Sequence, residues 1–60
     1  MVEIKFSTDN AAFDNKTDGI YDTLTELART VLEEGVENMP PTRKIRDING
    51  NVIGEMTVTD

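Results

Sequence analysis

Residues Arg46 to Glu55, with the sequence RDINGNVIGE, decide the fold of this chain, because they set how its last two strands pair. The Asn49-Gly50 pair at their centre is a strong signal for a tight β-hairpin between Lys44 and Val58. A two-residue type I′ turn is one interpretation. A three-residue loop with a glycine bulge is the other, and Asp47 at the head of the turn favours it locally.

The pattern of apolar residues decides between these two registers. The two-residue turn places Ile45 opposite Gly54 and creates one apolar face, which consists of Ile45, Val52, Met56 and Val58. The three-residue loop places Ile45 on the opposite face from the other three residues. Because the buried face sets the register of a strand, we expect the two-residue turn. In that register, Ile48 and Ile53 point away from the core.

The same stretch also resembles a calcium-binding loop, because three oxygen-bearing side chains alternate in it: Asp47, Asn49 and Asn51. Such a loop requires a bidentate Glu at its twelfth position, where this chain has Val58. Neighbouring side chains of a strand also point to opposite faces, so these oxygens would not converge. A second loop, residues 14–19, has Lys16 at a ligand position and Thr25 at the twelfth. We expect neither loop to bind a metal ion.

Two further segments have clear periodicities. Residues Val2 to Phe6 alternate between apolar and charged side chains, as in a half-buried strand. From Ile20 onward the period is helical, and the residues of one wide apolar stripe are Ile20, Tyr21, Leu24, Leu27, Ala28, Val31 and Leu32. Asp18 is the expected N-cap, and Gly35 is the expected glycine at the C-terminal end. The predicted helix therefore covers residues 19–34.

These elements predict an α+β fold with the order β-α-β-β in a single domain, residues 1–60. One helix packs on one face of a three-stranded, mainly antiparallel sheet, and the last strand lies at the centre. Pro40-Pro41 prevents the helix from continuing. The charged Lys44 and Arg46 suit an edge strand, which must resist pairing with other chains. Phe13, an aromatic residue in a polar loop, is expected to pack back onto the core.

The charge and composition exclude several function classes. Twelve acidic and six basic residues give a net charge of −6, which repels nucleic acid and anionic membranes, so we expect no direct binding to either. The chain has no cysteine and no histidine, which excludes disulfides, the common zinc sites and catalysis by these residues. We find neither a signal-peptide pattern nor an apolar run of roughly 20 residues, so we expect a cytoplasmic protein.

The sequence contains no catalytic constellation. Asp22 and Glu26 lie one helical turn apart, but acidic residues on the polar side of a helix are ordinarily a solvated face. A Gly-x-Ser-x-Gly motif is absent, and the four glycines do not cluster. A domain of this size also has little room for a substrate pocket. We therefore expect a protein that is not an enzyme and needs no cofactor.

Two surfaces are candidates for binding another protein. The first is the acidic side of the helix and its C-terminal extension, formed by Asp22, Glu26, Glu33, Glu34 and Glu37. Such a surface could bind a basic groove on a partner, including a groove that normally holds nucleic acid. The second is the outer face of the sheet, where Ile48 and Ile53 would contact a partner or form a homodimer.

Both ends of the chain resemble a group of short, uncharacterised proteins encoded by bacteriophages and prophages. The segments that carry the resemblance are Ile4–Phe13, IKFSTDNAAF, and Ile45–Glu55, IRDINGNVIGE. The combination of the hairpin motif with Asn10-Ala11-Ala12-Phe13 is more specific than the hairpin motif alone. The resemblance implies an origin in a mobile element and action in the bacterial cytoplasm. It provides no catalytic residues.

Two functions remain as hypotheses. The first is a non-enzymatic phage-type accessory protein that binds and modulates a host or phage protein, for example an acidic inhibitor of a nucleic-acid-binding or defence protein. The alternative is a small self-associating structural module that dimerises through its exposed sheet face. The absence of a catalytic constellation and the charge of −6 favour the first.

Overall fold

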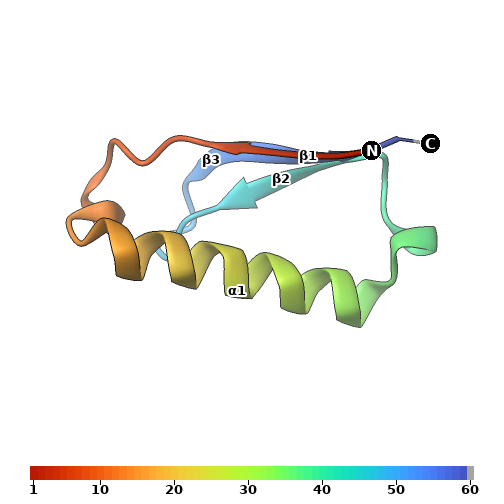
Figure 1. Ribbon diagram of the computed structural model, residues 1–60, viewed down its shortest axis with the longest axis horizontal. Helices are drawn as coiled ribbons and strands as arrows, with labels where there is room; N and C mark the ends of the chain where they lie inside the picture. Colours follow the sequence, from red (N-terminus) through yellow and green to blue (C-terminus); the bar gives the residue numbers. More distant parts are fainter. Residues whose placement is uncertain (60) are drawn as a thin grey trace.

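The computed structural model describes residues 1–59 and has the predicted order β-α-β-β. Its main elements are β1 (Val2–Phe6), α1 (Lys16–Glu34), β2 (Thr42–Arg46) and β3 (Val52–Val58). Two short 3₁₀ helices flank α1: η1 (Ala11–Phe13) precedes it and η2 (Val36–Asn38) follows it. The sheet forms one layer and α1 runs beneath it as a second layer (Figure 1).

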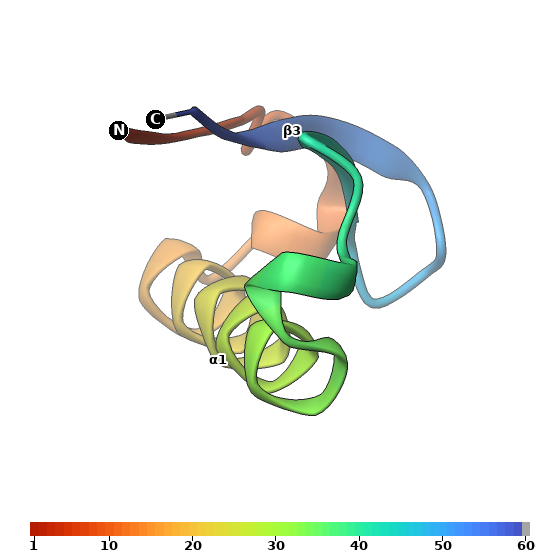
Figure 2. The same cartoon turned by 90° about the vertical axis from the view of Figure 1, so that its right-hand side faces the viewer.

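The sheet has the strand order β1-β3-β2, and β3 pairs antiparallel with both neighbours, as predicted. Ile4 lies opposite Met56, so the apolar residues of β1 share a face with those of β3. Figure 2 looks along α1 and shows the helix below this face. The alternating residues of the strands form a polar outer face, which consists of Glu3, Lys5, Thr42, Lys44, Glu55 and Thr57.

The turn of the hairpin is the three-residue loop. The amide of Asp47 donates to the carbonyl of Asn51 at 2.9 Å, and the amide of Gly50 donates to the carbonyl of Asp47 at 3.0 Å. Gly50 has a φ of 84°, the left-handed conformation that a glycine bulge requires. The expectation of a two-residue turn was therefore wrong, because the turn itself is set by local hydrogen bonds around Asp47.

The expected pairing of Ile45 with Gly54 is nevertheless confirmed, because a bulge follows the turn. Ile45 lies opposite Gly54, whereas Arg46 lies opposite Val52, and the register shifts between these two pairs. Ile53 is the extra residue on β3. The three-residue loop and the expected pairing of Ile45 with Gly54 therefore occur together in one hairpin.

The bulge changes which of Val52 and Ile53 faces the core. Ile53 packs against the core cluster, whereas Val52 is 48% exposed. The predicted inner face with Val52 was wrong, and so was the prediction that Ile53 points away from the core. The reason is that one inserted residue reverses which side chains face inward. Ile48, at the tip of the turn, is 74% exposed.

The helix begins three residues earlier than predicted. Asn15, not Asp18, is the N-cap, and its side-chain oxygen accepts a hydrogen bond from the Asp18 amide at 3.1 Å. Asp18 lies in the first turn, where its carboxylate complements the helix dipole. The C-terminal end is as predicted: α1 ends at Glu34, and Gly35 follows with a φ of 76°.

The core of the protein is small. Phe13, Leu27, Ile45 and Met56 are its buried apolar residues. Phe13 stacks on Phe6 with 6.1 Å between ring centroids, which confirms that it packs back onto the fold.

α1 is rotated about its axis relative to the predicted apolar stripe, and this rotation has a local cause at Gly19. A Cβ at Gly19 would lie 2.6 Å from the Phe13 ring, so η1 packs tightly on this point of the helix. The buried side of α1 therefore includes Gly19 and Thr23, whose hydroxyl donates to the Gly19 carbonyl at 2.9 Å. Half of the predicted apolar stripe is left uncovered: Tyr21, Leu24, Ala28 and Leu32 are exposed.

The close approach of β1 to β3 gives a prediction about Gly54. A Cβ at Gly54 would lie 1.9 Å from the Lys5 carbonyl oxygen and 2.5 Å from the Phe6 Cα. We expect Gly54→Ala to destabilise the fold by about 3 kcal/mol or more, enough to abolish cooperative unfolding of so small a domain. Urea unfolding followed by circular dichroism measures this effect.

The matched control is Gly50→Ala. No atom lies within 4 Å of a Cβ at Gly50, so this variant has only the cost of a positive φ, about 1 kcal/mol. Equal destabilisation by the two variants would contradict the close approach at Gly54.

Candidate protein-binding surface

The structure brings three of the predicted acidic residues to one side of α1. Asp22, Glu26 and Glu33 are exposed and lie on the side of the helix opposite to the Leu24 side. Arg29 lies among them: its guanidinium pairs with Glu26 and lies 4.0 Å from the Glu33 carboxylate. The surface is therefore acidic, but Arg29 offsets part of its charge.

The other two predicted acidic residues lie elsewhere. The Glu34 carboxylate turns toward the sheet and accepts a hydrogen bond from the Arg43 guanidinium at 2.6 Å. This pair joins the C-terminal turn of α1 to β2. Glu37 lies in η2, beyond the end of the helix. The predicted five-residue acidic surface therefore divides into three parts.

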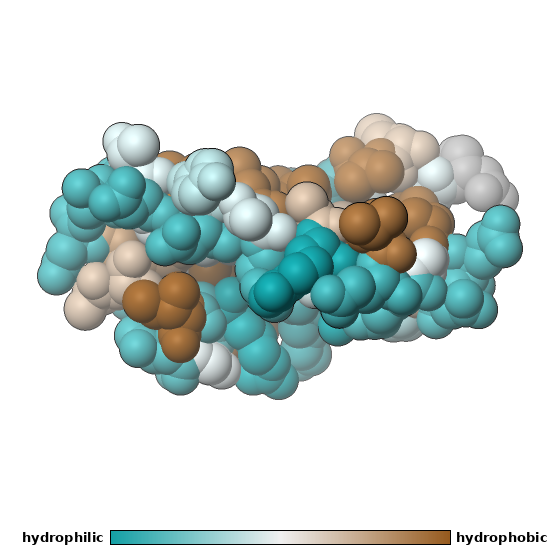
Figure 3. All heavy atoms as spheres, turned by 90° about the horizontal axis from the view of Figure 1, so that it is seen from below, coloured by the Kyte–Doolittle hydropathy of each residue, from teal (hydrophilic) through white to brown (hydrophobic). Residues whose placement is uncertain are grey.

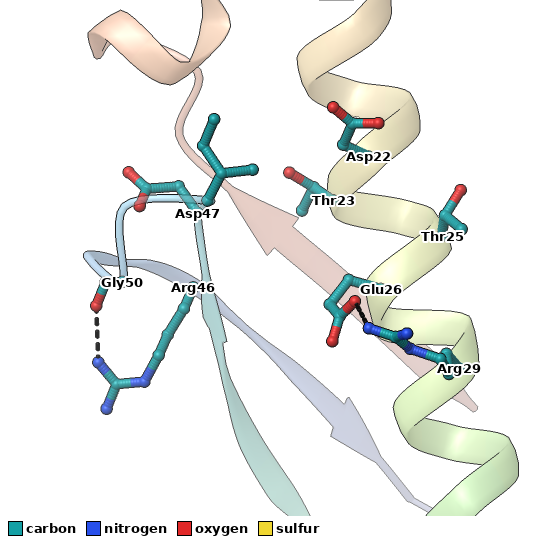
Figure 4. A pocket seen from close by; sticks show the side chains of 9 residues that line it. Asp22, Thr23, Thr25, Glu26, Arg29, Arg46, Asp47 and Gly50 are labelled. Atoms are coloured by element: carbon teal, nitrogen blue, oxygen red, sulfur yellow. Dashed lines mark hydrogen bonds and ion pairs between the residues drawn. The ribbon is translucent and has the colours of Figure 1, made fainter.

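A cleft of about 650 Å³ opens between α1 and the β2–β3 hairpin. The residues that line this hairpin–helix cleft are Asp22, Thr23, Thr25, Glu26, Arg29, Arg46, Asp47, Ile48 and Gly50. Figure 4 shows Asp22 and Glu26 on the helix and Arg46 on the strand that leads into the turn. The Arg46 guanidinium donates to the Gly50 carbonyl at 2.9 Å, which holds it at the hairpin.

The cleft combines residues that the sequence placed on separate surfaces. Ile48 was predicted on the outer face of the sheet, and Asp22 and Glu26 on the helix, but all three line one cleft. Arg29 and Arg46 were not predicted to belong to a site. Their only sequence signal is their proximity to acidic residues along the chain, because the approach of the hairpin to the helix is a tertiary contact.

At the base of the turn, Asp47 is a buried residue, and 7% of its surface is exposed. Its carboxylate accepts hydrogen bonds from the amides of Asn49 and Asn51 at 2.8 and 3.0 Å. It also accepts from the side-chain amides of Asn10, at 2.9 Å, and Asn51, at 3.3 Å. Burial by itself raises the pKa of this carboxyl, but the hydrogen bonds from Asn51, Asn49 and Asn10 lower the pKa below its usual value.

The bond between Asn10 and Asp47 joins two distant parts of the chain. The Asn10 side-chain oxygen accepts from the Ala12 amide at 2.9 Å and so caps η1, the short helix that carries Phe13. Asn10 lies in the segment IKFSTDNAAF and Asp47 in the segment IRDINGNVIGE. The N-terminal and C-terminal segments are therefore hydrogen-bonded to each other.

Comparison with protein-family models, with curated proteins and with solved structures gives no match to this chain. Within residues 1–59, no three acidic side chains lie close enough together to hold a metal ion. The same part of the chain has no helix with both the length and the apolar character needed to cross a membrane.

The lowered pKa of Asp47 predicts how stability depends on pH. A carboxyl whose pKa is lower in the folded state stabilises the fold above its unfolded pKa, and this contribution is lost as the pH falls through the folded pKa. We therefore expect Asp47→Asn to lower the melting temperature clearly at pH 7 and much less near pH 2. Thermal unfolding of both proteins across this range measures the difference.

The control for this prediction is Asp14→Asn, which removes the same charge from an exposed residue. The control should show no comparable change between pH 7 and pH 2. A difference between wild type and Asp47→Asn that stays constant over this range would contradict the role of the Asp47 carboxylate.

Proposed function

We propose that this protein is a non-enzymatic accessory protein of phage type that binds a host or phage protein through the hairpin–helix cleft and modulates it. The observation that supports the proposal best is the grouping of Asp22 and Glu26 with the exposed Ile48 around one cleft. An exposed apolar side chain flanked by charges is a common centre of a protein–protein contact.

The charges of the cleft indicate the chemistry of the partner. Glu26 is already paired with Arg29, so within the cleft Asp22 contributes most to the preference for a basic segment, and Ile48 provides a contact for an apolar side chain within that segment. The net charge of −6 adds a long-range attraction toward a basic surface. A protein that occupies a basic groove competes with nucleic acid for it, so an inhibitor of a nucleic-acid-binding or defence protein in the bacterial cytoplasm fits this chemistry.

The geometry of the cleft supports binding rather than catalysis. The cleft residue with the lowered pKa, Asp47, uses its carboxylate to accept four hydrogen bonds within the fold. Arg29 and Arg46 are likewise engaged, with Glu26 and with the Gly50 carbonyl. A general base requires a carboxylate that can reach a substrate proton.

The alternative, a module that dimerises through Ile48 and Ile53, loses its structural basis. Ile53 packs against the core, and Ile48 belongs to the cleft on the opposite side of the hairpin from the polar outer face. Self-association through these two residues is therefore not proposed.

Affinity capture from bacterial lysate with paired variants tests the proposal. We expect the wild type to recover a basic protein, and Asp22→Asn/Glu26→Gln to recover about tenfold less of it, since two charge contacts together contribute about 1.4 kcal/mol. Ile48→Ser should reduce recovery as well. Quantitative mass spectrometry of the captured proteins is the measurement.

The matched control is Asp9→Asn/Asp14→Asn, which removes the same charge from the exposed loop before α1. This control should recover the partner as the wild type does. Equal loss with both double variants would mean that net charge, rather than the cleft, drives binding. Recovery of no partner at low salt would contradict the proposed function.

A further inference from the structure

A second depression lies on the other flank of α1. This β1 groove, of about 490 Å³, is lined by nine apolar residues: Val2, Ile4, Leu24, Leu27, Ala28, Val31, Val36, Met56 and Val58. It lies between the edge strand β1 and the uncovered half of the helix stripe, away from the hairpin–helix cleft. Figure 3 views the molecule from below and shows hydrophobic atoms along the upper side, at the right and in one group at the lower left, while hydrophilic residues cover much of the rest.

Several apolar residues of this groove are not buried within the single chain. Val2 is 58% and Ile4 is 42% exposed, although both lie on the inner face of the sheet. Leu32, which is 84% exposed, extends the apolar surface along α1. Contiguous apolar surface of this kind marks an interface in a folded protein.

The surface area supports the same conclusion. The accessible surface of the chain is 4424 Å², whereas a compact monomer of this mass has about 3,900 Å². The radius of gyration, 11.6 Å, also exceeds the value of about 10 Å for a compact domain of this length. The chain thus exposes about 500 Å² more surface than a compact monomer of its mass. For comparison, each partner buries roughly 800 Å² in a standard interface.

The backbone of β1 is arranged to pair with another strand. The Thr59 amide donates to the Met1 carbonyl at 2.8 Å, and the Ser7 amide donates to the Ile53 carbonyl at 2.9 Å. These odd-numbered residues of the first strand thus bond toward β3. Because successive residues of a strand alternate in direction, Ile4 and its even-numbered neighbours direct their amides and carbonyls to the open edge.

The charges on β1 are self-complementary in one register. If two copies of β1 pair antiparallel about Ile4, each Glu3 lies opposite Lys5 of the other copy, and Val2 lies opposite Phe6. This register also aligns the free amides and carbonyls of the even-numbered residues. A shift by one pair in either direction places Glu3 opposite Glu3, or Lys5 opposite Lys5, so charge repulsion disfavours both alternatives.

We propose that two copies of this chain form a two-fold dimer in which their β1 strands pair antiparallel about Ile4. The pairing joins two three-stranded sheets into one sheet of six strands. The exposed flanks of the two α1 helices, with Leu24, Ala28 and Leu32, then cover the two β1 grooves from below.

A second copy fits this surface better than an unrelated partner. The acidic residues Asp22, Glu26 and Glu33 lie on the opposite flank of α1, so the dimer does not bring these carboxylates together. The Glu3 and Lys5 pattern is complementary to itself, which an isologous interface requires. The inference goes beyond the proposed function and leaves both hairpin–helix clefts open, so the dimer is bivalent.

Charge-reversal variants on the polar outer face test the dimer without touching the core. Sedimentation equilibrium of the wild type should give twice the chain mass of 6.7 kDa. Glu3→Lys and Lys5→Glu each place two like-charged pairs in the symmetric interface, so we expect each to weaken dimerisation about tenfold or more. An equimolar mixture of these two variants should dimerise again, because every cross-strand pair is then opposite in charge.

Three further variants and hydrogen exchange complete the test. The double variant Glu3→Lys/Lys5→Glu should dimerise as the wild type does, and Lys44→Glu, on the other sheet edge, should leave dimerisation unchanged. Ala28→Glu, at an exposed helix position, should stay folded by circular dichroism and sediment as a monomer. Hydrogen exchange should show that the Ile4 amide is protected in the wild type and exchanges faster in Glu3→Lys.

Each outcome of these experiments either supports or contradicts the proposed dimer. A wild type that stays monomeric at millimolar concentration overturns the proposal. A dimer that neither Glu3→Lys nor Lys5→Glu weakens, or that their mixture does not restore, also overturns it, because the β1 register would then be wrong. Restoration in the mixture together with protection of the Ile4 amide supports the proposed register directly.

Discussion

The hydrogen bonds of the Asp47 carboxylate connect the parts of this fold. Asn49 and Asn51 donate to it from the turn, and Asn10 donates to it from the loop before the helix. The carboxylate therefore shapes the three-residue loop and also holds the segment that carries Phe13. A chain with so few buried apolar residues depends on such a connection, because its core alone contributes little stability.

Two consequences of this arrangement shape the surface. The turn is followed by a bulge, which brings Ile53 to the core and leaves Ile48 exposed beside the helix. The packing of Phe13 on Gly19 rotates α1, so that its apolar stripe is only half covered by the sheet. The two flanks of one helix thus have different neighbours: a charged cleft with the hairpin and an apolar groove with β1.

These two surfaces suit different kinds of recognition. The proposed binding of a basic partner at the hairpin–helix cleft would use both charge and an exposed apolar side chain, because electrostatics guides association and the apolar contact slows dissociation. An uncharged groove beside an unpaired strand edge favours permanent association, as in obligate dimers. Separating the two surfaces allows a dimer to present two clefts, and two linked sites bind a repeated or dimeric partner more tightly than one site does.

The sequence by itself determined the elements of this protein and their order, because apolar periodicity, Pro40-Pro41 and the Asn49-Gly50 turn act over a few residues. It also predicted β3 at the centre and Phe13 in the core, both of which the structure confirms. Only the tertiary structure decided that Ile53 faces inward, which half of the helix stripe is covered, and that Asn10 meets Asp47. The physical reason is that a single bulge residue reverses the facing of a strand, while contacts between segments 37 residues apart leave no periodic signal in the sequence.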